Sequence, residues 1–558
     1  MIRTGIAQIN TTVGDFNGNI GKIGDNIAFA KKNDVDIVVF HELTVCGYPP
    51  EDLLHKRHFI ENNLKALSSL RKQTRGITAV VGFVDRDSEG NLYNAAAVLN
   101  NGKLAGVYRK ECLPNYGVFD EKRYFVPGKN NPLFMMGNLK IGINICEDLW
   151  PDNGIYQRQA KMGADLLINI SSSPYDLGKF EKREKLLARR AKETQCFVVY
   201  ANLIGGQDEI VFDGGSCAFN PHGRCVALAR LFEEDFLVID IPEPVKKRQG
   251  KQCIVLERTI QQQALSVNAR ITAVPEKTAE IYKALVLGTR DYIEKNGFEK
   301  VVIGLSGGID SALVAQIAVD ALGKDRVIGV TMPSQFTSSG TYTDARKIAE
   351  NFGIECLEVP VKPIFDVYLQ NLEKYFKGLP GGKTEENIQA RIRGNILMAL
   401  SNKFGWLVLT TGNKSEMAVG YCTLYGDMSG GFAVIKDVYK TTVYALVRYR
   451  NASIGRNLIP QTVIDRAPSA ELKENQRDQD SLPPYDVLDQ ILIEYVEKHN
   501  SFSGIVKKIK DEDVVKKVLW LVDHSEYKRR QSPPGVKITP RAFGKDWRFP
   551  ITNKYKNY

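Results

Sequence analysis

Short apolar runs alternate along the chain with longer stretches in which apolar residues recur every three or four positions. In the first half, residues 2–10 and 36–40 are predicted strands, and the amphipathic stretch 19–33 between them is a predicted helix. Residues 77–84 and 139–146 are further apolar runs of strand length. Alternating strands and helices are typical of α/β proteins, so we expect an α/β fold.

The second half repeats this alternation. Residues 301–305 form an apolar run that leads through a glycine-rich turn into a helical pattern at 311–322. Apolar runs at 327–333, 354–361 and 405–412 follow, with helical stretches between them. Strands that alternate with helices predict a doubly wound parallel sheet, and ligands of such sheets bind across the carboxyl ends of the strands.

A chain of 558 residues is longer than one hydrophobic core usually serves, so we expect at least two domains. The segment 242–252, PEPVKKRQGKQ, is rich in proline and charge and predicts a connector. We therefore place a first domain at 1–245, a linker at 246–275 and a second domain at 276–558.

Composition narrows the class of protein. Hydrophobic residues make up 43% of the chain and charged residues 25%, and no apolar run approaches the ~20 residues of a membrane helix. The nine cysteines form no CxxC pair, the six histidines are scattered, and the N-terminus lacks a signal-peptide pattern. We expect a cytoplasmic protein without a membrane partner. The net charge is +10, but the basic residues are interleaved with acids, which disfavours a nucleic-acid partner and suits polyphosphate substrates.

The turn at 306–311, SGGIDS, has the features of a phosphate-binding loop. Its glycines let the backbone approach an anion closely, and N–H groups at the start of the next helix point toward it. Ser306 and Ser311 add hydroxyl donors, and Asp310 offers a carboxylate to a phosphate-bound Mg²⁺. The ordinary alternative is a glycine turn that merely joins a strand to a helix. Serines and an acid in this setting favour a nucleotide site, and the missing Gly-Lys-Ser/Thr excludes a Walker loop.

Three predicted strands of the first half lead to residues with complementary chemistry, Glu42, Lys110 and Cys146. A thiol becomes a useful nucleophile beside a base, and a cation stabilises the oxyanion that its attack creates. Taken singly, each residue has an ordinary explanation as a solvated acid, a surface lysine or a structural cysteine. Their shared position at strand-to-loop junctions favours one catalytic site.

The segments HELTVCGYP, YRKECLPNYGVFDEKRYF and GINICEDLW resemble the three signatures of the nitrilase (carbon–nitrogen hydrolase) family, which has a Glu-Lys-Cys triad. The resemblance implies an α-β-β-α sandwich. It also implies that Cys146 attacks a carboxamide carbon and forms a thioester, that Glu42 is the general base and that Lys110 stabilises the oxyanion. Glu121 matches a second glutamate that the family places near the triad.

Within this family, LPNY and SSSPYDLGK are similar to the glutaminase half of glutamine-dependent NAD⁺ synthetases. This similarity implies that Tyr116, Ser173 and Lys179 hold the α-amino and α-carboxylate groups of glutamine. Without it, a core aromatic at Tyr116 and a strand-end cap at Ser173 remain open.

In the second half, SGGIDS resembles the pyrophosphate loop of the ATP pyrophosphatase group, whose sheet is Rossmann-like and of the adenine nucleotide α hydrolase type. TTGNKSEMAVGYCTLYGDMSGGFAVIKDVYKT and HSEYKRRQSPPGVKIT resemble NAD⁺ synthetase signatures. The implied ATP-binding residues are Gly304, Leu305, Ser306, Gly307, Gly308, Ile309, Asp310, Ser311, Thr411 and Lys440. The implied deamido-NAD⁺-binding residues are Asn387, Glu416 and Lys528, and the implied Mg²⁺ ligands are Asp310 and Glu416. An ordinary basic tail at Lys528 and a solvated polar helix face at Asn387 remain open.

Together the resemblances imply a ligase that amidates deamido-NAD⁺ through an acyl-adenylate, with ammonia released from L-glutamine and passed internally. The open alternative is another glutamine amidotransferase of the ATP pyrophosphatase group that acts on a different carboxylate or carbonyl. A catalytically silent nucleotide- or nucleic-acid-binding module would require a broken triad, and the triad is intact. The resemblance also implies a homo-oligomer, commonly an octamer.

Overall fold

The computed structural model describes residues 1–245, 253–259 and 269–556, which divide into two compact units, Met1–Pro275 and Glu276–Tyr558. The predicted linker at 246–275 falls partly on residues 246–252 and 260–268, which lie outside the described residues. Its described residues 254–256 form a strand of the first unit. Among the described residues, no helix combines the length and apolarity needed to cross a membrane.

Two mixed sheets form the first unit. The first sheet has the order β14 (Asp235–Ile241), β1 (Ile2–Gln8), β2 (Ile37–Val39), β3 (Thr78–Arg86), β4 (Leu92–Asn100) and β5 (Lys103–Arg109). The second has the order β13 (Cys225–Leu228), β12 (Cys217–Phe219), β9 (Phe197–Asn202), β8 (Leu166–Ser171), β7 (Leu139–Ile145), β6 (Leu133–Met136) and β15 (Ile254–Leu256). A separate hairpin joins β10 (Ile204–Gln207) to β11 (Ile210–Asp213).

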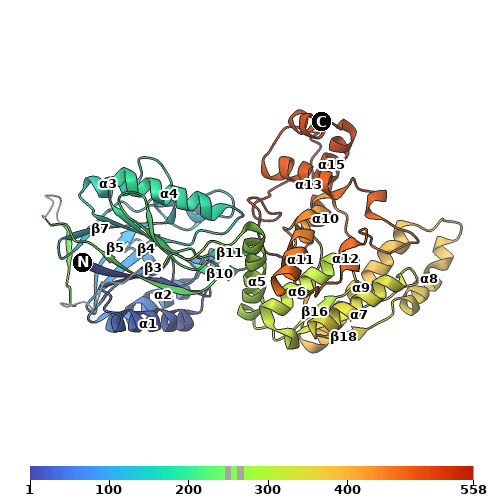
Figure 1. Cartoon of the computed structure of the whole chain (residues 1–558), viewed down its shortest axis with the longest axis horizontal. Coiled ribbons are helices and arrows are strands. Elements are labelled where there is room, and N and C mark those ends of the chain that lie inside the picture. Colours follow the sequence, from blue (N-terminus) through green and yellow to red (C-terminus); the bar gives the residue numbers. More distant parts are fainter. Residues whose placement is uncertain (246–252, 260–268, 557–558) are drawn as a thin grey trace. The chain divides into compact units, whose positions relative to one another are not determined.

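Helices cover the outer face of each sheet. Figure 1 shows α3 (Ile155–Lys161) and α4 (Lys179–Thr194) on one side of the sheets and α1 (Phe16–Lys32) on the other, where α2 (Arg57–Leu70) packs against it. Alternation along β2 illustrates the layering, because Ile37 and Val39 enter the core between the sheets and Val38 enters the core under α1 and α2. The predicted α-β-β-α sandwich is confirmed.

The second unit contains one parallel sheet, in the order β18 (Glu355–Glu358), β17 (Val327–Thr331), β16 (Val301–Gly304), β19 (Leu407–Thr410) and β20 (Phe432–Ala433). Chain order reverses between β16 and β19, so the sheet is doubly wound and the predicted fold class is confirmed. The helices of this unit are α5 (Lys277–Lys295), α6 (Ile309–Leu322), α7 (Ser339–Phe352), α8 (Lys362–Phe376), α9 (Lys383–Phe404), α10 (Lys414–Val419), α11 (Lys440–Ile454), α12 (Gln461–Asp465), α13 (Tyr485–Leu492), α14 (Phe502–Ile509), α15 (Glu512–His524) and α16 (Glu526–Arg529).

Helix α6 begins two residues earlier than the sequence pattern predicts, at Ile309 rather than at Ser311. Gly307 alone makes the turn, with a φ of 79°, and Gly308 is already extended at the N-cap. Asp310 and Ser311 therefore lie in the first turn of the helix, close to its positive end.

Gly82 of β3 leaves room for the backbone that carries Glu42. A Cβ at this position would lie 2.4 Å from the Leu43 nitrogen and 2.5 Å from the His41 oxygen. We expect Gly82→Ala to lower the free energy of unfolding of the first unit by roughly 1–3 kcal/mol, because backbone atoms must move. Urea denaturation measures the change.

Gly21 of α1 is the matched control, because a Cβ there meets no atom within 4 Å. Gly21→Ala should raise stability by about 0.5–1 kcal/mol through the helix propensity of alanine. Equal effects of the two substitutions would contradict the close approach at Gly82.

Candidate active sites

A buried lysine joins two glutamates at the strand ends of the first unit. Lys110 follows β5, and its Nζ donates to Glu42 Oε1 at 2.7 Å and to Glu121 Oε1 at 2.8 Å. The side chains of Lys110 and Glu42 have no exposed surface, and that of Glu121 is 5% exposed. Because a buried charge is costly unless it is paired, the ammonium and the two carboxylates must stay together.

Further donors fix the Glu42 carboxylate. Asn94 Nδ2 of β4 donates to Glu42 Oε1 at 2.7 Å, and the Ser172 backbone N–H donates to Glu42 Oε2 at 2.8 Å. Sequence reasoning missed both residues. The run of serines after β8 was a weak signal for Ser172, but no pattern pointed to Asn94.

Cys146 lies directly after β7, at the start of the 3₁₀ turn Cys146–Leu149. Its φ of 44° falls in the left-handed region, which is strained for a residue with a Cβ and recurs at functional sites. Burial raises the pKa of the thiol, Glu42 raises it further, and Lys110 lowers it. The surroundings of the thiol therefore favour its protonated form, and the thiol lies within electrostatic reach of both Glu42 and Lys110.

The predicted glutamine-binding residues divide into two groups. The Tyr116 hydroxyl donates to Glu147 Oε2 at 2.9 Å, and the Lys179 ammonium lies over the Trp150 ring at 4.9 Å and interacts with Glu147 electrostatically. Ser173 is buried, and its N–H donates to the Asn202 side chain at 2.9 Å. Tyr116 and Lys179 thus gather around Glu147, a residue that sequence reasoning missed although it directly follows Cys146 in the chain.

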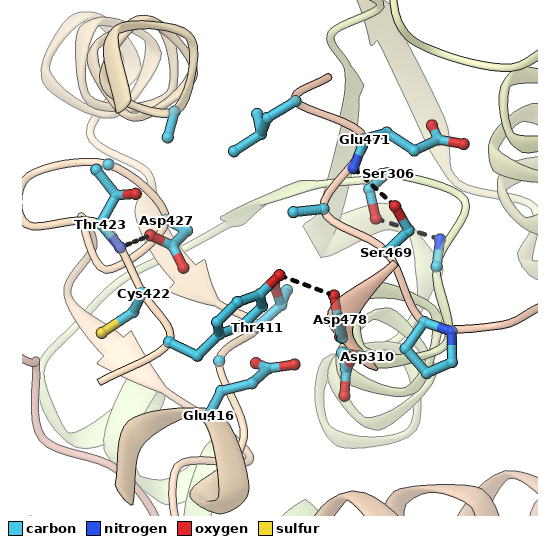
Figure 2. A pocket seen from close by; sticks show the side chains of 18 of the residues that line it. Ser306, Asp310, Thr411, Glu416, Cys422, Thr423, Asp427, Ser469, Glu471 and Asp478 are labelled. Carbon is cyan, nitrogen blue, oxygen red and sulfur yellow. Dashed lines mark hydrogen bonds between the residues drawn. The ribbon is translucent and has the colours of Figure 1, made fainter. Parts of the chain in front are cut away.

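The second unit contains a cavity of about 1140 Å³ at the carboxyl ends of its strands. Figure 2 shows Ser306, Asp310, Thr411 and Glu416 on its walls. All the residues that the resemblance implies for ATP and deamido-NAD⁺ line this cavity: residues 304–311, Asn387, Thr411, Glu416, Lys440 and Lys528.

The turn after β16 is braced from both sides. The Ser306 and Ser311 hydroxyls lie 3.1 Å apart, and the Gly308 N–H donates to Ser306 Oγ at 3.2 Å. Arg466 donates to the Gly307 carbonyl at 3.2 Å, and a Cβ on Gly307 would lie 2.2 Å from the Thr341 oxygen. Only glycine fits at position 307, so the turn is held open toward the cavity.

A second buried lysine joins two carboxylates in this cavity. Lys440 Nζ donates to Asp310 Oδ2 and, at 3.3 Å, to Glu416 Oε1. Burial raises the pKa of Glu416 to about 8, an effect that Lys440 opposes and Asp310 reinforces. Burial alone would lower the pKa of Lys440, but Asp310 and Glu416 raise it above its usual value.

Two more carboxylates, which sequence reasoning missed, line the same cavity (Figure 2). Asp478 accepts from the Tyr485 hydroxyl at 2.8 Å and from the Tyr421 hydroxyl at 3.2 Å. Asp427 accepts from the Thr423 N–H at 2.7 Å, and burial raises the pKa of each carboxyl. Asp427 lies in a turn and Asp478 begins the short 3₁₀ helix Asp478–Asp480, and hydrophobic periodicity carries no information in such segments.

The N-termini of α10 and α11 carry Glu416 and Lys440. The Asn413 side chain accepts from the Glu416 N–H at 3.0 Å and caps α10. The Ser415 hydroxyl accepts from the Lys440 N–H at 2.9 Å and donates to Asp489 of α13. These bonds fix the two helix starts relative to one another.

Asn387 and Lys528 brace the segment that follows α10. Asn387 Oδ1 accepts from the Thr423 hydroxyl at 2.8 Å, and Lys528 Nζ donates to the carbonyls of Gly420 and Cys422 at 2.7 and 2.8 Å. These two side chains therefore lie on the cavity wall and hold its shape.

Two families of known proteins match different parts of the chain. Residues 3–247 match the carbon-nitrogen hydrolase family, and residues 281–532 match the NAD synthase family. The glutamine-dependent NAD⁺ synthetase of Aquifex aeolicus is 48% identical, over 100% of this chain and 100% of the relative. That of Thermotoga maritima is 46% identical, over 100% of this chain and 99% of the relative. The structure of the Acinetobacter baumannii glutamine-dependent NAD⁺ synthetase with ADP is 42% identical with a TM-score of 0.77, over 99% of this chain and 98% of that one.

The matches define a two-part enzyme class, in which a carbon–nitrogen hydrolase unit is joined to an NAD synthase unit. Because relatives are 46% and 48% identical over their whole length, the chain belongs to the glutamine-dependent NAD⁺ synthetase family. The resemblance inferred from the motifs is confirmed.

Glu121 generates a testable pH dependence. Burial raises its pKa from 4.5 to about 7, with Lys110 opposing and Glu42 adding to the shift. Between these pH values the folded chain binds more protons than the unfolded chain, so the stability contribution of Glu121 falls as pH rises through this window. Glutamine does not titrate, so Glu121→Gln lacks this loss of stability. As pH rises from 5 to 8, the free energy of unfolding of the variant should therefore increase by roughly 1–3 kcal/mol relative to that of wild type. Urea denaturation of both proteins at several pH values measures the difference, and parallel stability curves would contradict it.

Proposed function

We propose that residues 1–245 release ammonia from L-glutamine, that residues 276–558 use it to amidate deamido-NAD⁺ at the expense of ATP, and that 246–275 connect them. The observation that carries this proposal is that one chain holds both a buried Glu42–Lys110 pair beside Cys146 and a cavity lined by the SGGIDS loop. Membership of the glutamine-dependent NAD⁺ synthetase family supports it.

In the first step Cys146 Sγ attacks the carboxamide carbon of glutamine, and Glu42 takes the thiol proton. The raised pKa of the thiol explains why a base must remove that proton as the bond forms. Lys110, oriented by Glu121, stabilises the oxyanion. Ammonia leaves with a proton from Glu42, and water activated by Glu42 then hydrolyses the thioester to glutamate.

Glutamine is held by its α-groups in this proposal. Tyr116, Ser173 and Lys179 bind them, and the Glu147 carboxylate pairs with the α-ammonium. Support comes from the contacts of Tyr116 and Lys179 with Glu147, which place a negative charge between an aromatic hydroxyl and an ammonium. Such polar groups at a pocket fix the orientation of the ligand.

In the second unit, the backbone of 304–311 together with Thr411 and Lys440 binds ATP, while Asn387, Glu416 and Lys528 bind deamido-NAD⁺. A carboxylate oxygen of deamido-NAD⁺ attacks the α-phosphorus, and pyrophosphate leaves. Ammonia then attacks the carbonyl carbon of the acyl-adenylate and displaces AMP, which forms the amide of NAD⁺. The N–H donors of the loop and the Lys440 ammonium stabilise charge on the phosphates.

The donor set fits Mg²⁺. Asp310, Glu416 and Asp478 bring three carboxylates to the single ammonium of Lys440, and such hard oxygens are the ligands that Mg²⁺ prefers. Asp310 and Glu416, which share the Lys440 ammonium, would hold the ion together with phosphate oxygens. When bound, Mg²⁺ neutralises charge on the departing pyrophosphate.

Ammonia is mostly ammonium at neutral pH, and ammonium is not a nucleophile. An enclosed route from Cys146 to the adenylate would preserve the reactive form, and we include such a route in the proposal. By resemblance to the family we also propose a cytoplasmic homo-oligomer, commonly an octamer, with small-molecule substrates and no nucleic-acid partner.

Cys146→Ala tests the division of labour. Removal of the nucleophile should reduce glutamine-dependent NAD⁺ formation by more than about 1,000-fold. Synthesis from added ammonium salt should stay within two-fold of wild type. The measurement is NAD⁺ formed from deamido-NAD⁺ and ATP with either nitrogen source. Equal loss of both activities would refute separate sites, and a wild-type chain that forms no NAD⁺ would favour the alternative amidotransferase.

Asp310→Ala tests the phosphate end of the cavity. Loss of this carboxylate should slow both glutamine- and ammonium-dependent synthesis by about 100-fold or more, because it removes several kcal/mol of stabilisation from the charged transition state. Glutamate release in the first unit serves as the internal control for an intact chain. Survival of either synthetic activity at the wild-type rate would exclude the proposed role of Asp310.

A further inference from the structure

Two short segments carry the reactive thiol and the ammonium of the first unit. Lys110 lies at the centre of 108–112, which leaves the first sheet after β5, and Cys146 lies in 145–149, which leaves the second sheet after β7. The segments come from different sheets, so strand pairing does not set the distance between them.

One buried carboxylate contacts both segments. Asp148 Oδ2 accepts from the Ile145 N–H at 2.9 Å and from the Tyr108 hydroxyl at 2.7 Å, while Oδ1 accepts from the Cys112 N–H at 2.8 Å. The Asp148 side chain is completely buried. Burial raises its pKa to about 6 and the three donors oppose the shift, so the group is ionised at neutral pH and both oxygens accept.

Asp148 also closes the strained turn of the nucleophile. Its bond to Ile145 spans Cys146, whose φ of 44° persists only while the surroundings hold it. Its bond to Cys112 fixes the chain two residues beyond Lys110. A carboxylate with three short hydrogen bonds therefore holds the thiol turn and the lysine segment in one arrangement.

We propose that Asp148 is a positioning residue of the glutaminase reaction, which sets the placement of the Cys146 thiol relative to the Lys110 ammonium through backbone contacts. This inference rests on the proposed function. Asp148 contacts neither the thiol nor the ammonium, so it acts on the rate through geometry. A displacement of about 1 Å in such a site costs on the order of 100-fold in rate.

Asp148→Asn tests the proposal in the full chain. An amide has one acceptor oxygen, so its NH₂ group must face either the Cys112 N–H or the pair of donors at Oδ2. The kcat for glutamate release should fall about 10- to 100-fold. The KM for glutamine should stay within two-fold, because Ser173 and Lys179, which bind the α-groups in the proposed function, lie outside the two segments that Asp148 joins. NAD⁺ synthesis from ammonium should be unchanged.

Asp36→Asn is the matched control. Asp36 is also a buried carboxylate of this unit, and it accepts a hydrogen bond from the Arg3 backbone N–H at 2.9 Å. Asp36 precedes β2 whereas Glu42 follows it, so the two residues lie at opposite ends of that strand. This variant measures the general cost of neutralising a buried carboxylate and should keep kcat within two-fold of wild type. An equal fall of kcat in both variants would overturn the proposal.

Tyr108→Phe gives a graded test that does not depend on the folding of Asp148→Asn. It removes one of the three donors to Asp148 and should lower kcat about three-fold at constant KM. An unchanged kcat in Tyr108→Phe, a kcat of Asp148→Asn within two-fold of wild type, or an effect confined to KM would each overturn the positioning role. Wild-type protein that releases no glutamate would instead contradict the proposed function, and the inference would fall with it.

Discussion

Both candidate sites depend on the pairing of a buried lysine with two carboxylates. Lys110 joins Glu42 and Glu121 in the first unit, and Lys440 joins Asp310 and Glu416 in the second. Burial of any one of these charges without its partners would cost several kcal/mol of desolvation free energy. The strand ends and helix starts that carry the charged residues are far apart in sequence, and this cost requires them to lie close together in the folded chain. The folds of the two units differ, but the same constraint determines where each fold places its chemistry.

The two clusters serve different purposes in the proposed chemistry. In the first unit Lys110 donates to both Glu42 and Glu121, and Asn94 and Ser172 hold the carboxylate that is the proposed base for the Cys146 thiol. In the second unit burial raises the pKa of Glu416, Lys440 opposes the shift and Asp310 adds to it, which suits a site proposed to take up a cation together with polyphosphate. The proposed role of the second site therefore depends on bound ligands, whereas Glu42 has its hydrogen-bond donors within the first unit.

The alternation of strands and helices predicted the α/β class and the doubly wound sheet of the second unit, and glycines mark the turn at 306–311, whereas the sandwich of the first unit was implied by the resemblance of its motifs to a known family. Sequence reasoning also predicted that Glu42, Lys110 and Cys146 lie at strand ends. It did not find Asn94 or Asp148, because their bonds join residues between 3 and 52 positions apart, and the bonds of Asp148 to Tyr108 and Cys112 connect the two sheets. The start of α6 was misjudged because one glycine, rather than the whole SGGIDS segment, makes the turn.

The cavity of the second unit has a consequence for the order of events. Its volume of about 1140 Å³ lies above the roughly 300–1,000 Å³ of common ligand pockets, which suits the proposed binding of ATP and deamido-NAD⁺ in one cavity. In the proposed reaction both substrates occupy this cavity before the first bond is made, which corresponds to a ternary complex and intersecting double-reciprocal lines for this pair. The thioester proposed for the other unit corresponds to a substituted-enzyme pattern, so the proposed function gives one polypeptide two kinetic regimes.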